Sequence, residues 1–285
     1  MIQYLIYNAT LVLIYVMVSL SFALPVGFTG LVNLGQVGLF AIGAYASAIL
    51  TTHGISFWIA LPLSALITML VGLLLALPAR RVKSDYYALL SLGFLFVVNS
   101  ILIGWINLTR GPFGISGIDR PAFFQTPVSF LLLTFAVTVI IGLFVYRLIR
   151  SPFGKALEAV RDDDQVAESL GKPVGKLRVL SIFISAFIVG IAGAFLAHFI
   201  RFINPQLFWL DNVIWILAAL VLGGLASFRG AIFGMVFLFI ATEAIRFFPF
   251  SSDVLGALRL ISLSLLLLGF VLFKPKGLFG RAQLE

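Results

Sequence analysis

The sequence contains no cysteine and only two histidines. Without cysteine there can be no disulfide bond, cysteine-ligated zinc or iron–sulfur cluster, and two histidines are too few for a metal site built from imidazoles. Charged residues are also scarce, at 11% of the chain, whereas 61% of the residues are hydrophobic. This composition does not suit a soluble globular domain. It predicts an integral membrane protein with no metal ion or cofactor of its own.

A nucleotide-binding loop is missing as well. The P-loop motif G-x-x-x-x-G-K-[ST] holds phosphates with backbone amides and a lysine, and no glycine in this sequence is followed by Lys-Ser or Lys-Thr. The sequence therefore predicts that the chain is not an enzyme and has no ATPase site. If ATP drives its activity, ATP and magnesium have to bind to separate chains.

Long apolar runs fill most of the chain. About 20 apolar residues suffice to cross a hydrocarbon core roughly 30 Å thick. Candidate spans lie near 4–24, 31–51, 57–77, 86–106, 128–147, 178–200, 213–228, 231–248 and 254–273. The second and seventh contain several glycines and other small residues, so we expect at least one broken or re-entrant segment. The predicted fold is all-α: a polytopic integral membrane protein forming a single domain over 1–285, with about eight transmembrane helices, within a range of six to ten.

Basic residues gather at 80–83, at 147–178 and at 274–281. Lysine and arginine are enriched in cytoplasmic loops, so the pattern predicts that these three regions, including the C-terminus, face the cytoplasm. The formal net charge of +8 is thereby explained by membrane topology. We expect membrane lipid and no nucleic acid among the partners.

One stretch is far more polar than the rest of the chain. Twelve of the thirty charged residues lie between Arg147 and Arg178, and Pro and Gly residues bracket a helical pattern within it. Its apolar residues recur at helical spacing and form one narrow stripe: Leu157, Val160, Ala167 and Leu170. We interpret residues 155–170 as a helix that docks into a groove of a soluble partner; the alternative is a solvated helix lying on the membrane. The acidic run Asp162–Asp164 has no partner that the sequence identifies.

Several segments together resemble one family of transporters. The stretch EAVRDDDQVAESLGKPVGKLRVL is similar to the cytoplasmic coupling loop of the LivM-type permeases of branched-chain amino acid ABC importers. Five other segments resemble the same family and occur in its order: 27–48, 108–118, 184–208, 221–234 (VLGGLASFRGAIFG) and 273–280 (FKPKGLFG). The resemblance covers most of the chain.

This resemblance implies a permease subunit of an ATP-driven importer for leucine, isoleucine, valine or related amino acids in the bacterial inner membrane. The implied partners are a homologous second permease, two cytoplasmic ATP-binding subunits and a periplasmic amino-acid-binding protein. The coupling loop corresponds to about 150–177, and the expected ATPase-coupling residues are Leu157, Glu158, Ala159, Val160, Ala167 and Gly171.

The translocation pathway is expected between the two permeases, lined by the small-residue spans. A faint repeat relates GLVNLGQVGLFAIG, from Gly30, to GLASFRGAIFG, from Gly224. The candidate lining residues are Gly30, Asn33, Gly35, Gly38, Gly223, Gly224 and Ser227.

Two charged residues fall inside an apolar span. Glu243 and Arg246 are three residues apart, so they share a helix face and are predicted to form an intramembrane ion pair. Membrane-embedded charges of this kind also serve ion coupling. The alternative function is therefore a secondary transporter or channel that works alone.

Overall fold

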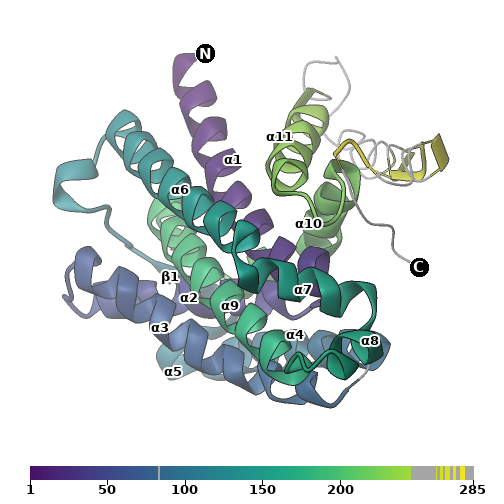
Figure 1. Cartoon of the computed structure of the whole chain (residues 1–285). Coiled ribbons are helices and arrows are strands. Elements are labelled where there is room, and N and C mark those ends of the chain that lie inside the picture. The colour runs from purple at the N-terminus through teal and green to yellow at the C-terminus, as the bar shows by residue number, and fades with distance from the viewer. Residues whose placement is uncertain are drawn as a thin grey trace.

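The structure is a computed structural model that describes residues 1–82 and 84–244, together with 261, 264–265, 267–269, 272–273 and 277–279. The described chain is almost entirely helical (Figure 1), which confirms the predicted all-α class. Its helices are α1 Ile2–Phe22, α2 Gln36–Thr52, α3 Phe57–Ala76, α4 Ser84–Gly104, α5 Ile106–Thr109, α6 Pro127–Arg150, α7 Pro152–Asp162, α8 Asp164–Ser169, α9 Val174–Ile200, α10 Leu210–Gly223 and α11 Phe228–Ala244.

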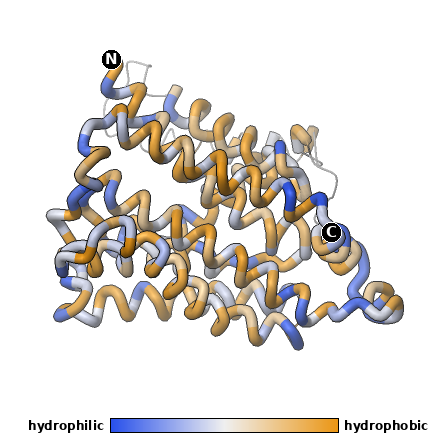
Figure 2. The backbone as a smooth tube through the Cα atoms, turned by 60° about the vertical axis from the view of Figure 1, so that its left-hand side comes forward, coloured by the Kyte–Doolittle hydropathy of each residue, from blue (hydrophilic) through white to orange (hydrophobic). Residues whose placement is uncertain are grey.

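Six helical segments within the described residues are long and apolar enough to cross a membrane. They are Ile2–Phe28, Phe57–Ala76, Ser84–Gly104, Pro127–Arg150, Val174–Ile200 and Pro205–Gly223. The helices α2 and α11 are shorter, at 17 residues each. Figure 2 shows apolar residues along most of the helices and polar residues concentrated at their ends. The polytopic architecture is confirmed, whereas the count of eight stays a prediction, and most of the candidate span 254–273 lies outside the described residues.

A broken segment begins where α1 ends, ahead of the second span in which the sequence placed it. The helix widens beyond Phe22 into a π-helical turn, Ala23–Phe28, and 30–35 form no helix. Pro25 explains the change, because proline has no N–H to donate and its ring disrupts the α-helical ladder. The Pro25 carbonyl instead accepts hydrogen bonds from the N–H of Leu31 at 2.9 Å and the hydroxyl of Thr29 at 2.5 Å. Consequently α2 starts at Gln36, five residues later than the predicted start of the second span at 31.

A second break separates α10 from α11. The predicted span 213–228 is shifted, because α10 begins at Leu210 and ends at Gly223, where the chain turns. Next to it α11 begins at Phe228 rather than near 231. The two helices approach so closely that a β-carbon on Gly223 would overlap the backbone of Gly230.

The core is organised around α9, which packs on α1, α2 and α3. Glycines allow its backbone to come close to that of α2. A β-carbon on Gly43 would lie 2.6 Å from Gly190 Cα, and one on Gly193 would lie 2.6 Å from the nitrogen of Ala44. Small residues at such crossings let membrane helices pack by direct backbone contact.

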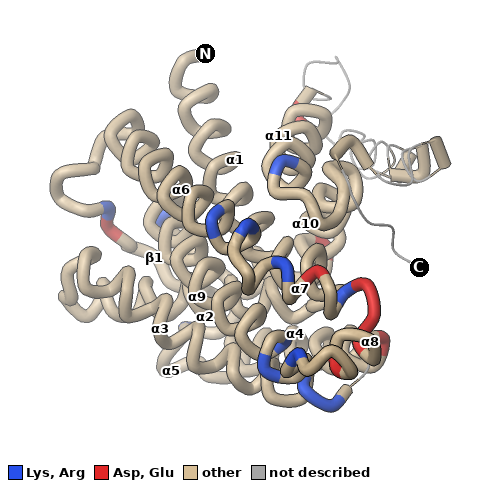
Figure 3. Tube along the Cα trace, viewed as in Figure 1, with Lys and Arg blue, Asp and Glu red and all other residues tan. Residues whose placement is uncertain are grey.

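Basic and acidic residues are concentrated around α7 and α8, as Figure 3 shows. The opposite end of the molecule is closed by the long connection between α5 and α6. Its strand β1, Ile115–Ser116, pairs antiparallel with β2, Phe202–Ile203, just after α9. An ion pair of 2.8 Å between Asp119 and Arg201 joins the same two segments. The connection is therefore held against the end of the central helix.

Candidate coupling site

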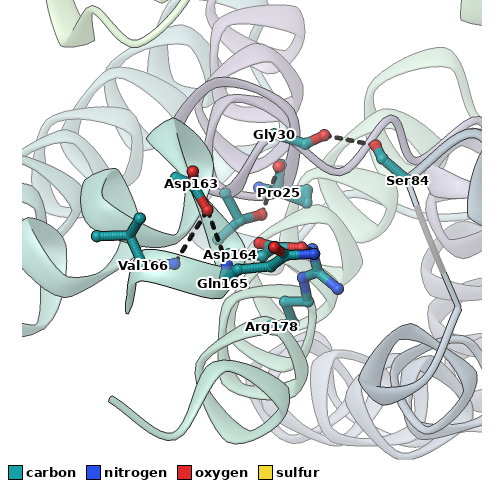
Figure 4. Close-up of polar contacts among 9 residues, drawn as sticks. Pro25, Gly30, Ser84, Asp163, Asp164, Gln165, Val166 and Arg178 are labelled. Carbon is teal, nitrogen blue, oxygen red and sulfur yellow. Dashed lines mark hydrogen bonds and ion pairs between the residues drawn. The ribbon is translucent and has the colours of Figure 1, made fainter. Parts of the chain in front are cut away.

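The charged segment folds as two short helices. Ser151 caps α7, its hydroxyl accepting from the N–H of Gly154 at 3.4 Å, and Pro152 occupies the first turn. Asp163 is extended, with φ −162° and ψ 113°, and its carboxylate caps α8 by accepting from the N–H groups of Gln165 at 2.8 Å and Val166 at 3.0 Å (Figure 4). The prediction of one helix over 155–170 is therefore wrong at Asp163, because its side chain starts a new helix.

Every carboxylate of the run Asp162–Asp164 has a partner in the structure. Asp162 pairs with the preceding Arg161 at 2.6 Å, and Asp163 caps α8. Asp164 forms an ion pair with Arg178, a buried residue in the first turns of α9 (Figure 4). The run that the sequence left unassigned thus caps α8 and joins it to the central helix.

The Asp164–Arg178 pair leads to an asymmetric prediction. Asp164 is 43% exposed and its carboxylate can be hydrated, whereas Arg178 is buried. Asp164→Asn, which leaves a buried cation unpaired, is expected to lower the free energy of unfolding by about 3 kcal/mol, and Arg178→Gln by roughly half as much. Thermal unfolding of the purified variants measures both. The double variant should be no less stable than Asp164→Asn, and losses that simply add in the double variant would contradict the pairing.

The two helices bury one apolar face and expose another. Three of the predicted coupling residues, Leu157, Val160 and Ala167, are buried against the rest of the chain. Leu170 and its neighbour one turn earlier, Val166, are exposed to 72% and 53%. The predicted apolar stripe is therefore divided: most of it anchors the segment, while α8 presents an apolar pair outward.

The remaining predicted coupling residues are at least partly accessible. Glu158 and Ala159 are half-buried on α7. Gly171 follows α8 with φ +77°, in the left-handed region that favours glycine, and nothing lies within 4 Å of a β-carbon placed on it.

Arg161 connects α7 to the broken end of α1. Its Nη1 donates to the carbonyl of Gly27 at 3.4 Å, and its Cγ would lie 3.3 Å from a β-carbon on Gly30. The Gly30 carbonyl in turn accepts a 2.6 Å hydrogen bond from Ser84, at the start of α4 (Figure 4). Sequence reasoning missed this contact, although Arg161 lies four residues after the buried Leu157 and so on the same helix face.

Buried amides hold the non-helical segment 30–35. Asn33 donates to the Gln36 side chain at 3.0 Å and accepts from the N–H of Gly35 at 3.1 Å. Gln36 donates to the hydroxyls of Ser21 at 3.1 Å and Ser185 at 2.7 Å. Such bonds are needed because backbone outside a helix cannot be left unpaired in a membrane. Sequence reasoning missed Gln36, whose only local signal is that it is an amide in an apolar run.

The candidate lining residues fall into two groups that meet. Asn33 is fully buried, and Gly35 and Gly38 pack closely against α4. Gly223 and Gly224 lie at the break between α10 and α11, and Ser227 caps α11 by accepting from the N–H of Gly230 at 3.1 Å. The breaks touch, because a β-carbon on Gly27 would lie 3.0 Å from the nitrogen of Ala226. A role for these residues in translocation stays a prediction.

Near the end of α11, Glu243 accepts a hydrogen bond from the hydroxyl of Tyr4 on α1. Both residues line a largely apolar cavity of about 720 Å³ between α1, α6 and α11. The predicted partner Arg246 lies outside the described residues.

Comparison with known proteins identifies the family of the chain. Residues 4–273 match the protein family described as the permease component of branched-chain amino acid transport systems. The chain belongs to this family. The branched-chain permease family includes LivM of Salmonella typhimurium, a high-affinity branched-chain amino acid transport system permease protein, which is 33% identical over 97% of this chain and 71% of its own length. The resemblance seen in the sequence is confirmed.

Two further similarities are more distant. LivH of Methanocaldococcus jannaschii, a probable branched-chain amino acid transport permease protein, is 26% identical over 93% of this permease and 88% of its own length. A solved structure of PsaBC from Streptococcus pneumoniae in complex with Fab aligns with a TM-score of 0.49 and 17% identity, over 94% of this chain and 91% of that one.

Proposed function

We propose that this permease is the membrane-spanning subunit of an ATP-driven ABC importer for branched-chain or related amino acids. The observation that carries the proposal is the family match over 4–273, together with 33% identity to a LivM protein along nearly the whole chain. The lack of a P-loop in the sequence supports a complex in which this chain forms the membrane part and other subunits bind ATP and magnesium.

The proposed complex contains a second, homologous permease, two cytoplasmic ATP-binding subunits and a periplasmic amino-acid-binding protein. Relatives named LivM and LivH both match this chain, which supports a pair of related permeases. The complex lies in the bacterial inner membrane, with 147–178 and the C-terminus in the cytoplasm. The described residues 277–279 support this orientation, because the N–H groups of Leu278 and Phe279 donate to the end of α10, beside the break that α7 reaches.

Coupling is proposed to run through α8, α7 and the two breaks. Val166 and Leu170 insert into a groove of an ATP-binding subunit, and Leu157 and Val160 keep α7 fixed to the membrane domain. When the ATP-binding subunits close, α7 moves with them and Arg161 passes the movement to Gly27 and Gly30. The differential contacts in the two states then shift the permease between inward-open and outward-open forms.

The pathway is proposed to lie between the two permeases and to close at the two breaks. The segments 30–35 and 224–227 contain five of the seven candidate lining residues and lie at the end of the molecule that bears α7. A short non-helical segment can change shape at smaller cost than a whole helix, because fewer hydrogen bonds and side-chain contacts are exchanged.

Reconstitution tests the proposal. Proteoliposomes with both permeases, the ATP-binding subunits and the binding protein should take up labelled leucine only when ATP is present. This chain alone should neither hydrolyse ATP nor transport leucine. Uptake by the chain alone, driven by a proton or sodium gradient, would instead establish a transporter that works without partners. Glu243, a charged residue in a membrane helix, is the reason for that alternative.

A further inference from the structure

A second cavity, of about 500 Å³, lies at the end of the molecule opposite α7 and α8. Helix α4 runs between the two ends: its first residue, Ser84, binds Gly30 beside the coupling site, and its last two turns carry Asn99 and Ile103 into the cavity wall. The other wall comes from the turn that leads into α10. The volume of the cavity falls within the range of about 300–1,000 Å³ typical of small-molecule sites.

Asn99 is the most unusual residue of this cavity. It is only 1% exposed, and its Nδ2 donates to the carbonyls of Phe208 at 3.0 Å and Leu95 at 3.3 Å. Its Oδ1 is buried and accepts no hydrogen bond from the described residues. A buried acceptor without a donor costs about 1–3 kcal/mol, so a donor supplied by a ligand would be bound favourably.

The turn opposite Asn99 is firmly positioned. The Asn204 side chain accepts from the N–H of Leu207 at 3.2 Å, and Asn212 donates to the carbonyl of Leu207 at 2.6 Å. Phe208 is buried edge-to-face on Phe40, with ring centroids 5.3 Å apart. The carbonyl that holds the Asn99 amide therefore belongs to a fixed backbone, and this amide oxygen keeps its orientation.

Other polar groups line the same cavity. Asp211, in the first turn of α10, is exposed and places a carboxylate at the cavity. No side chain caps the start of α10 in the described structure, and its first N–H groups carry the positive end of the helix dipole. The Gln206 amide lies on the same rim, while Ile103 and Trp209 provide apolar walls.

We propose that this cavity binds a free α-amino acid at the outer end of the permease. The ammonium group donates to Asn99 Oδ1 and to the Asp211 carboxylate. The carboxylate accepts from the start of α10 and from Gln206, and the aliphatic side chain lies against Ile103 and Trp209. This inference rests on the proposed function, to which it adds a binding site in the permease itself, distant from the coupling site.

Ligand-observed NMR on the assembled permease–ATPase complex in nanodiscs, without the binding protein, tests the site directly. L-leucine should bind with a dissociation constant on the order of 1 mM, because high affinity is left to the binding protein. The analogue 4-methylpentanoate, which lacks the ammonium group, should bind at least about tenfold more weakly. Equal binding of the two compounds, or no binding of any branched-chain amino acid, would refute the site.

Matched carboxylate variants keep the test independent of folding. Asp211→Asn removes an exposed charge from the cavity and should weaken leucine binding about tenfold. The control, Asp119→Asn, removes another exposed charge at the same end, outside this cavity, and should leave binding unchanged. Asn99→Leu should abolish binding, but it also removes a structural hydrogen bond, so the conclusion rests on Asp211. Wild-type binding by Asp211→Asn would overturn the proposal.

The same samples separate this inference from the proposed function. ATP-driven leucine uptake by the complete complex, without leucine binding at the cavity, would refute the cavity site alone. Leucine binding that is sensitive to Asp211→Asn, without ATP-driven uptake, would refute the importer and leave the site standing.

Discussion

Replacing Leu170 by aspartate is expected to lower the affinity of the ATP-binding subunits for the permease about thirtyfold and to reduce leucine uptake with it. Leu170 is 72% exposed and forms an apolar pair with Val166 on a helix too short to be fixed by its own hydrogen bonds. A hot-spot residue at the centre of an interface contributes about 2 kcal/mol or more, which corresponds to roughly that factor. Co-purification of the subunits and uptake in proteoliposomes measure the two effects.

The adjacent residue supplies the control. Ser169 is exposed on the same short helix, and Ser169→Asp adds the same charge one residue away. It should retain most of the uptake, and both variants should have wild-type thermal stability. Normal uptake by Leu170→Asp, or equal loss in the two variants, would remove α8 from the coupling route.

The second large effect concerns folding. Gly193→Leu is expected to destabilise the permease by about 3 kcal/mol or more, because a side chain there would collide with backbone atoms of Phe40 and Ala44 on α2. Two backbones in contact can accept a side chain only by moving apart, which removes the packing between the central helix and its neighbour. Size-exclusion chromatography and thermal unfolding in detergent should show loss of most of the folded protein.

Gly93 provides the matched comparison. It lies within α4, and nothing is found within 4 Å of a β-carbon placed on it. Gly93→Leu should therefore leave the protein folded and even favour the helix, because leucine has the higher helix propensity. If Gly93→Leu and Gly193→Leu lower the yield equally, the cause is glycine replacement in general rather than the close contact.

The membrane helices and the charged segment could be predicted because their signals are local. Twenty apolar residues in a row, or twelve charges within 147–178, can be recognised without knowledge of any distant residue. The division of that segment at Asp163 was missed, because aspartate is compatible with a helix interior as well as with a cap. Whether Asp163 acts as a cap depends on whether Asp164 can pair with Arg178, 14 residues further along the chain.

The inward and outward faces of the coupling segment could not be assigned for a different reason. A helical period shows that Leu157, Val160 and Ala167 share a face, but the membrane domain and a soluble partner can both cover an apolar face. The buried amide contacts were also invisible, since Gln36 and Ser185 are separated by 149 residues. Both the burial of each helix face and the buried amide contacts can be recognised only in the tertiary structure.

The contact between α10 and α11 determines how this part of the permease can move. Gly223, Gly230 and Gly234 bring the two backbones together without side chains between them. Sliding one helix past the other would open empty space that no neighbouring side chain could fill. The two helices are therefore expected to rotate together as one rigid unit about the contact between Gly27 and Ala226. Under the proposed coupling, a movement of α7 is therefore expected to produce a larger displacement at the far end of α11.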